Sequence, residues 1–269
     1  MIRRLHEADR QLALALLNRQ PELNLYMLGN LETLGFGADY CEFWGDFEED
    51  LSGTTTLRAI LNRYMTGWTV FGLERADWPG LGHVLDSAPG TATRLQDNPG
   101  GIDSFLPYLS AYRAGRTFSE ELMTLDAAAF VPLPPPPGLQ VRRATMDDLH
   151  ALTPFYANAE SMTRMPASIE RPVRDTRLWI ALETGTVVAA ALTNAETVDL
   201  AMIGGVYTLP SRRGCGFSQA VCSALCAELL SATKRPVLYW ESPAAGRVYR
   251  KLGFQPAGVW RSVWLQEVS

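Results

Sequence analysis

A run of prolines near the middle of the chain restricts its fold more than any other feature. Five of the 17 prolines fall within residues 131–138, whose sequence is VPLPPPPG. Consecutive prolines fix the backbone angle φ and supply no N–H donors, so this segment cannot enter a helix or the interior of a sheet. We interpret it as a short, stiff linker. The predicted organisation is a first domain over residues 1–130, a linker over 131–138 and a second domain over 139–269.

The two sides of this linker begin with the same pattern. An arginine pair followed by an aspartate occurs twice at a constant offset of 139 residues, as Arg3-Arg4 with Asp9 and as Arg142-Arg143 with Asp148. Each copy is typical of a short strand that leads into a helix, and Thr145 forms a plausible capping pair with Asp148. The repeat suggests two copies of one architecture.

Hydrophobic periodicity and turn signals predict a similar order of elements on both sides. In the first half we expect helices near 9–19, 24–34, 81–87 and 102–113, and strands near 41–47, 55–61, 68–73, 92–95 and 122–125. In the second half we expect helices near 146–158, 217–232 and 244–252, and strands near 178–183, 187–194, 199–208, 237–240 and 258–266. Both halves are therefore predicted to be helices covering a mixed sheet, in the α/β (α+β) class.

Composition excludes several other classes of protein. Hydrophobic residues make up 47% of the 269, which is too many for a disordered chain. The four cysteines and three histidines lack zinc-type spacing, so neither a metal site nor a disulfide framework is expected. The charged start MIRRLHEADRQ does not resemble a secretory signal, and no apolar run is long enough to cross a membrane. We expect a cytoplasmic protein that does not insert into membranes.

Charge is distributed unevenly along the chain. Residues 1–138 carry 10 Lys/Arg against 18 Asp/Glu, a net charge of −8, whereas residues 139–269 carry 14 against 11, a net charge of +3. Neither half is basic enough to predict a nucleic-acid partner. The positive second half favours a small anionic ligand.

The segment 206–218, VYTLPSRRGCGFS, carries the clearest chemical signal. An apolar strand enters a proline-containing turn, after which Gly214, Gly216 and Ser218 open an amphipathic helix. The first amides of a helix have no intrahelical partners and carry partial positive charge, while glycines let a phosphate approach the backbone. With Arg212 and Arg213 adding charge, this segment predicts a binding site for an anion such as a pyrophosphate.

Two common nucleotide motifs do not fit this segment. A Rossmann fingerprint requires glycine where the chain has Gln219, and the P-loop string Gly-x-x-x-x-Gly-Lys-Ser/Thr does not occur. A tight turn that binds nothing is the alternative without a function. A nucleotide-binding protein that uses the same helix start is a further alternative.

The same residues resemble the signature of the GNAT superfamily of acyl-CoA-dependent N-acyltransferases. Its motif Arg/Gln-x-x-Gly-x-Gly/Ala aligns with Arg213, Gly216 and Ser218, where Ser218 replaces the usual Gly or Ala. A second family motif, Asn-x-x-Ala-x-x-x-Tyr-x-x-x-Gly-Phe, aligns with Ser242, Ala245, Tyr249, Gly253 and Phe254. Ser242 replaces the asparagine that in the family lies near the pantetheine chain. The two motifs occur in the order expected for the family.

This resemblance implies a fold, a cofactor and a set of roles. It implies two GNAT-like domains, each a mixed, mostly antiparallel sheet flanked by helices, with acetyl-CoA as co-substrate. The cofactor site would comprise Val206, Tyr207, Thr208, Arg213, Gly214, Cys215, Gly216, Phe217, Ser218 and Ser242. In the first half, the corresponding segment 72–79 reads GLERADWP, whose acids oppose a pyrophosphate, so this half resembles a degenerate copy.

The resemblance also implies catalytic residues. Tyr249 matches the family tyrosine that faces the thiolate of CoA. Glu241 is our first candidate for the general base, followed by Glu196 and Asp199. The expected reaction is direct transfer of an acetyl group to a primary amine of a small molecule or a peptide. A non-catalytic CoA-binding or scaffolding module is the alternative. The acceptor, the acyl length and the oligomeric state are left open by the sequence.

Overall fold

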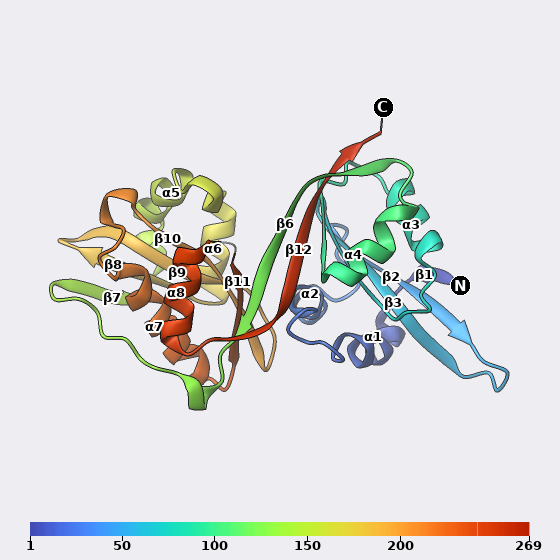
Figure 1. Cartoon of the computed structure of the whole chain (residues 1–269), viewed down its shortest axis with the longest axis horizontal. Coiled ribbons are helices and arrows are strands. Elements are labelled where there is room, and N and C mark those ends of the chain that lie inside the picture. The colour runs from blue at the N-terminus through green and yellow to red at the C-terminus, as the bar shows by residue number, and fades with distance from the viewer. Residues whose placement is uncertain (241, 269) are drawn as a thin grey trace. The chain divides into compact units, whose positions relative to one another are not determined.

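The computed structural model describes residues 1–240 and 242–268, which form two compact units (Figure 1). Unit 1 comprises Met1–Leu122 and Gly258–Ser269, and unit 2 comprises Met123–Ala257. The division differs from the predicted ranges in two places. The boundary falls at residue 122 rather than 130, and the chain after residue 257 returns to unit 1. Two long strands, β6 (Tyr112–Thr124) and β12 (Gln255–Glu267), carry the chain between the units.

Unit 2 is built on a sheet with the strand order β11-β10-β9-β8-β7. Its neighbouring strands are antiparallel except for β10 and β11, which are parallel. The end of β6 adjoins this sheet, because the residue that follows the strand, Leu125, donates from its backbone N–H to the carbonyl of Pro236 at 3.0 Å. The strands are β7 (Leu139–Arg143), β8 (Leu178–Glu183), β9 (Thr186–Glu196), β10 (Leu200–Thr208) and β11 (Arg235–Trp240).

Two pairs of helices cover the two faces of this sheet. On one face, α5 (Leu149–Ala157) and α6 (Pro166–Asp175) bury an apolar cluster that includes Phe155 and Ile169. On the other face, α7 (Phe217–Ser231) and α8 (Pro243–Leu252) bury a second cluster. Strands buried on both faces read as nearly continuous apolar runs, as in the VVAAAL segment of β9.

Unit 1 repeats this arrangement in the strand order β1-β2-β3-β4-β5-β12-β6. Helices α1 (Arg10–Leu17) and α2 (Leu25–Leu34) bury one apolar cluster, and α3 (Trp78–Ser87) and α4 (Pro99–Phe105) bury another. Its strands are β1 (Ile2–Arg4), β2 (Cys41–Glu49), β3 (Thr55–Tyr64), β4 (Gly67–Gly72) and β5 (Arg94–Asp97), together with β6 and β12. The predicted α/β (α+β) class is confirmed.

The sequence repeat corresponds to a repeated ion pair. Nη1 and Nη2 of Arg142 both donate to Asp148 at 2.7 Å, and those of Arg3 donate to Asp9 at 2.7 and 2.6 Å. The Thr145–Asp148 capping pair forms as predicted. Arg142 lowers the pKa of Asp148 to about 2, so this carboxylate stays ionised above that pH and ties β7 to the start of α5.

Two expected elements differ from the structure, and one helix was not expected. The helix predicted over 102–113 ends early, because α4 stops at Phe105 and β6 begins at Tyr112. The strand predicted over 122–125 is only the end of β6, which runs for 13 residues. Its exposed, polar side chains lack the apolar alternation that marks a strand. Helix α6 was not expected, because Pro172 lies inside it.

One buried carboxyl group makes the stability of unit 1 sensitive to pH. Asp97 at the end of β5 is 1% exposed, and its Oδ2 has no hydrogen-bond partner among the described residues. Burial raises the pKa of Asp97 well above 3.8, so the folded state keeps the proton that the unfolded chain releases. Stability contributed by this group is therefore present below pH 3.8 and is lost as the pH rises towards the raised pKa.

We expect Asp97→Asn, which preserves shape without ionising, to raise the Tm at pH 7 by several degrees. A gain of 1 kcal/mol shifts the Tm of a domain of this size by about 2–4 °C. Thermal unfolding followed from pH 4 to 8 measures the effect. Asp39→Asn, at an exposed position, is the matched control and should leave the Tm unchanged. A lower Tm for Asp97→Asn at pH 7 would show that the ionised carboxylate stabilises the fold.

No helix within residues 1–240 and 242–268 is long and apolar enough to cross a membrane.

Candidate functional site

The sheet of unit 2 opens between two of its strands. The parallel strands β10 and β11 pair over only three positions, from Leu200–Arg235 to Met202–Val237, although both strands continue beyond them. The second half of β10 stays paired with β9 on its other side. Backbone groups of β10 that would otherwise bond to β11 therefore face an opening between the strands.

An irregularity in β10 lies at this opening. The register with β9 shifts between Gly204 and Tyr207, and Gly205 has a φ of +57°, in the left-handed region that glycine tolerates. The hydroxyl of Tyr156 in α5 donates to the carbonyl of Gly205 at 2.7 Å. Burial raises the pKa of Tyr156, so it remains a donor and fixes the bulge.

Of the predicted strand residues, Val206 lies within this irregularity, and Tyr207 and Thr208 follow it. Tyr207 is buried under α5 and donates from its hydroxyl to the carbonyl of Asn158 at 3.2 Å. Leu209 donates from its N–H to β9, so alternation directs the N–H of Thr208 away from β9. The hydroxyl oxygen of Thr208 is buried without a partner among the described residues. Val206 and Thr208 are both partly exposed.

The loop after β10 leads into helix α7, whose start has no side-chain cap. A 3₁₀ helix, η6 (Pro210–Arg212), precedes Gly214 and Gly216, whose φ values are +81° and +82°. Gly216 is the N-cap of α7 and offers no side-chain acceptor. The first backbone bond of the helix runs from Ala220 to Gly216, which leaves the amides of residues 217–219 without a partner among the described residues.

The surroundings of this helix end are open. A Cβ added at Gly214 would meet no atom within 4 Å, and one at Gly216 would meet only Pro136, at 3.6 Å. Cys215 between them is an exposed free thiol, Phe217 anchors the helix in the core, and Ser218 is partly exposed. Unpaired amides, open space and a 15-residue helix dipole together form a surface suited to an anion.

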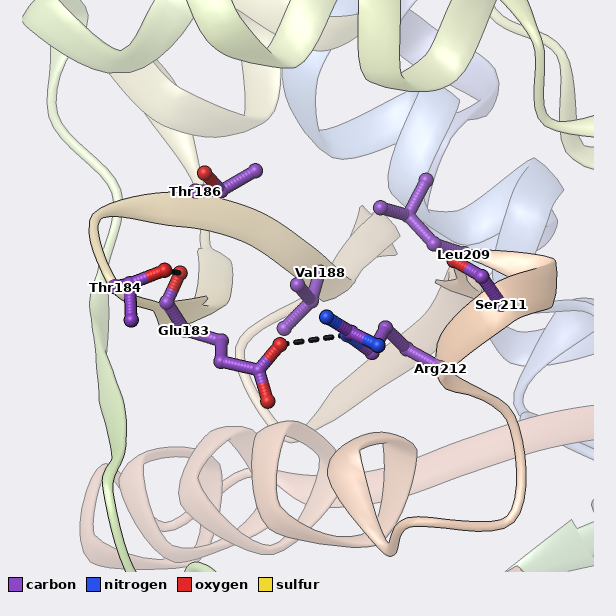
Figure 2. A pocket seen from close by; sticks show the side chains of 7 residues that line it. All are labelled: Glu183, Thr184, Thr186, Val188, Leu209, Ser211 and Arg212. Carbon is purple, nitrogen blue, oxygen red and sulfur yellow. Dashed lines mark hydrogen bonds and ion pairs between the residues drawn. The ribbon is translucent and has the colours of Figure 1, made fainter.

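The two arginines of the loop have different partners. Arg213 donates from Nη2 to Glu160 at 2.9 Å and from Nε to the carbonyl of Thr208 at 3.4 Å, so its guanidinium stays beside the opening of the sheet. Arg212 instead donates from Nε to Glu183 at 2.6 Å. Figure 2 shows Arg212 directed at Glu183 beside the β8–β9 hairpin. Both residues line a cavity of about 200 Å³. Of the two arginines, only Arg213 contacts β10.

Two predicted residues lie on α8. Ser242 is its N-cap, and its hydroxyl accepts from the N–H of Ala245 at 3.4 Å. Tyr249 is 6% exposed and packs against the core beneath α7, with its ring 5.8 Å from that of Phe254. Burial raises the pKa of Tyr249 well above 10, so its hydroxyl remains protonated. That hydroxyl makes no hydrogen bond to another described residue.

The three candidates for the general base differ in what the structure shows of their surroundings. Glu241 lies outside the described residues. Glu196 is partly buried and is held by Arg177, by Lys234 at 3.6 Å and by the hydroxyl of Thr193 at 2.8 Å. Asp199 is exposed on the turn before β10. The carboxylate of Glu196 is therefore already engaged by two cations and one hydroxyl group.

Three residues that the sequence did not single out border the same opening. Glu160 holds Arg213, while Arg164 and Asn194 lie against the bulge of β10. Glu160 belongs to the 3₁₀ helix η5 (Glu160–Met162), between α5 and α6. Its φ of +52° is unusual for a residue other than glycine. A segment without periodicity gives no signal from which this placement could have been read.

Unit 1 has the same opening but a different helix start. Its parallel strands β4 and β5 also pair over three positions, and a cavity of about 590 Å³ lies beyond them, between the end of β4 and the start of α4. Helix α3, the counterpart of α7, is capped by Asp77, whose carboxylate accepts from the N–H of Gly80 at 3.0 Å. A carboxylate therefore occupies the position where unit 2 presents free amides.

This fold is that of GNAT acetyltransferases. A GCN5-related N-acetyltransferase from Sphaerobacter thermophilus superposes with a TM-score of 0.64 at 18% identity, covering 99% of this chain and 95% of that one. A tandem GNAT protein from the clavulanic acid biosynthesis pathway gives 0.63 at 14% identity, covering 99% and 98%. A Drosophila protein gives 0.70 at 14% identity, covering 98% of each chain.

The family comparison agrees with the fold. Residues 182–265 match the model of the FR47-like protein family, which spans the strands and helices of the site from the end of β8 to β12. No curated protein sequence matches the chain. The GNAT-like fold predicted from two short motifs is confirmed.

Proposed function

We propose that this protein is an acetyl-CoA-dependent N-acetyltransferase whose active site lies in unit 2. The uncapped, glycine-opened start of α7, placed beside the opening between β10 and β11, is the observation that carries the proposal. Its free amides and Arg213 would bind the diphosphate of CoA. The free backbone edge of β10 and the hydroxyl of Thr208 would then bind the amide-containing pantetheine arm.

The proposed reaction is direct attack of an amine on the thioester carbonyl. The C–N bond forms, the C–S bond breaks, the amine loses one proton and the sulfur leaves as a thiolate. Backbone N–H groups of β10 beyond the bulge would stabilise the negative charge on the carbonyl oxygen. An ordinary amine of pKa near 10.4 must also lose a proton, which costs about 4.6 kcal/mol at pH 7. Glu241, which directly follows β11 in the chain, stays our candidate for accepting that proton.

Tyr249 has a defined part in this proposal. A tyrosine with a raised pKa is a weak acid, so complete transfer of its proton to a thiolate of pKa near 8.5 is unfavourable. Donation of a hydrogen bond from its hydroxyl to the departing sulfur is the role its burial supports.

The cytoplasmic location expected from the sequence stays a prediction.

We expect Tyr249→Phe to lower kcat by about tenfold or more while the affinity for CoA changes less than twofold. The substitution removes only the hydroxyl, whose hydrogen bond strengthens as the thiolate forms. Steady-state rates and a direct CoA titration measure the two quantities. Tyr156→Phe is the comparison variant, because it also removes one buried tyrosine hydroxyl. That hydroxyl bonds to the bulge of β10 and is not the one proposed to face the thiolate. Unchanged kcat in Tyr249→Phe would remove Tyr249 from the chemistry.

Release of free thiol from acetyl-CoA tests the proposed function itself. A panel of small-molecule and peptide amines is added, and amine-dependent thiol release with a matching acetylated product is expected. CoA binding with slow, amine-independent hydrolysis would instead support the non-catalytic module. Comparison of CoA with ATP and NAD in the same binding assay separates both from a general nucleotide-binding protein.

Unit 1 is assigned a different role. We infer that it is a degenerate copy, because Asp77 both occupies an amide of α3 and places negative charge at the helix start. These features oppose a diphosphate at that position. The acidic first half noted in the sequence agrees with this inference.

A further inference from the structure

Arg164 lies at the opening of unit 2 with most of its hydrogen-bonding capacity unused. It sits between η5 and α6, partly buried, with its Cζ 5.9 Å from the centre of the Tyr156 ring. Its Nη2 donates to Oδ1 of Asn194 at 3.0 Å. Its Nε is buried and has no partner among the described residues. A guanidinium has five N–H donors. A buried donor without a hydrogen-bond partner costs free energy, because it has lost its bonds to water.

Two consecutive glycines bring this arginine against the backbone of β10. A Cβ at Gly205 would lie 2.9 Å from Nε of Arg164, and a Cβ at Gly204 would lie 2.0 Å from Nδ2 of Asn194. Larger residues at either position would displace these side chains. Arg164 therefore lies directly on the bulge, where β10 has separated from β11 and where the proposed function puts the reacting carbonyl.

The charge of Arg164 is also uncompensated. Three other arginines of unit 2 are paired with a carboxylate, as Arg142–Asp148, Arg177–Glu196 and Arg213–Glu160. Within residues 1–240 and 242–268, no carboxylate forms an ion pair with Arg164. The nearby Glu160 and Glu196 already have cationic partners. A partly buried arginine without a counter-ion is suited to an anionic ligand, which its planar donors can bind through two oxygens.

We propose that Arg164, oriented by Asn194, binds a carboxylate of the acceptor. The inference rests on the proposed function and assigns the substrate class. The acceptor is an amine that carries a carboxylate within a few bonds, as an amino acid does, rather than a polyamine or an aminosugar. A carboxylate held by Arg164 would direct the amine towards the bulge of β10.

The first experiment compares acceptors that differ only in the acid group. A set of amino acids, their amides and their decarboxylated amines is assayed with acetyl-CoA, together with a phosphorylated amine. The expected kcat/KM is at least a hundredfold higher for the amino acids than for the amides and amines. A preference for the phosphorylated amine, or equal rates with and without the carboxylate, would overturn the inference.

Variants test whether Arg164 is responsible for the preference for acceptors that carry a carboxylate. We expect Arg164→Gln to lower the acid-to-amide ratio of kcat/KM at least tenfold, mainly through KM, and Arg164→Lys to retain part of it. Arg171→Gln is the matched control, because Arg171 is exposed on α6 and donates to the backbone carbonyl of Asn194. It should leave the ratio unchanged. A thermal melt and a CoA titration establish that each variant is folded. An unchanged ratio in Arg164→Gln would overturn the assignment.

A binding measurement separates this inference from the proposed function. N-acetylated amino acids, the expected products, are titrated into the CoA-loaded protein, and the corresponding amides serve as the comparison. Acid-selective binding that falls at least tenfold in Arg164→Gln is expected whether or not turnover is seen. Absence of thiol release with this binding intact would contradict the enzyme alone. Binding that is equal in both proteins would contradict the role of Arg164.

Discussion

Arg213→Glu is expected to weaken CoA binding by at least about thirtyfold. The guanidinium lies at the end of the opening in unit 2, within 3.4 Å of the carbonyl of Thr208. Reversing its charge replaces attraction to a diphosphate by repulsion. A unit pair about 4 Å apart in water contributes about 1 kcal/mol, so the reversal costs about 2 kcal/mol, or about thirtyfold in Kd. Isothermal titration with CoA at low ionic strength measures it, because salt screens exposed charges.

The neighbouring arginine supplies the control for this experiment. Arg212→Glu makes the same change of charge one residue away, but Arg212 is directed at Glu183 on the β8–β9 hairpin (Figure 2). We expect its effect on the Kd to be about threefold or less. An equal loss in both variants would indicate a general field effect rather than a contact. An unchanged Kd in Arg213→Glu would contradict the diphosphate site.

Gly216→Asp is expected to weaken CoA binding by about a hundredfold or more without unfolding the protein. Gly216 has a φ of +82° and caps α7 without a side chain. An aspartate there would bring negative charge to the free amides, as Asp77 does at the start of α3 in unit 1. Negative charge is favourable at a helix start, so the same substitution that excludes a diphosphate suits the helix dipole.

Gly216→Asn is the matched variant, because it has the same size and asparagine tolerates a positive φ about as well as aspartate. Both variants carry the same steric and backbone cost, so the difference between them reports charge alone. We expect the aspartate variant to bind CoA at least tenfold more weakly than the asparagine variant, a difference of about 1.4 kcal/mol. The two Tm values should agree within a few degrees. Equal CoA affinities would mean that the helix start does not bind an anion.

Local residue chemistry was sufficient to predict much of unit 2. The glycines and proline between β10 and α7 restrict the backbone wherever they occur, so residues 206–218 could be assigned to a strand, a turn and a helix. The Arg142–Asp148 pair could be recognised because the same residues recur as Arg3 and Asp9. Both features depend on residues that are close in sequence.

Features that depend on distant residues could not be predicted. The return of β12 to unit 1 is determined by packing of residues such as Val263 and Leu265 in the core of that unit, and its own sequence is compatible with either sheet. Likewise, Arg164 and Glu160 reach the site from a separate segment of the chain, between α5 and α6, before β8, β9, β10 and α7. The sequence therefore predicted the glycine-rich loop and the start of α7 but missed the side chains that surround them.

The structure also gives a physical reason for the difference between the two copies. Both units keep the opening between two parallel strands, which the order of their elements produces. The starts of the corresponding helices α7 and α3 differ in charge, because α7 is capped by Gly216 and α3 by Asp77. The acids noted at 72–79 include Asp77, so the sequence did predict that the two copies differ in charge at this position.

The position of bound acetyl-CoA tests the account most directly. A crystal structure of the complex should place diphosphate oxygens about 2.7–3.2 Å from the backbone nitrogens at the start of α7, with the thioester carbonyl beside the bulge of β10. Density for the diphosphate in the cavity of unit 1, or amides of residues 217–219 bonded to the protein itself, would contradict it.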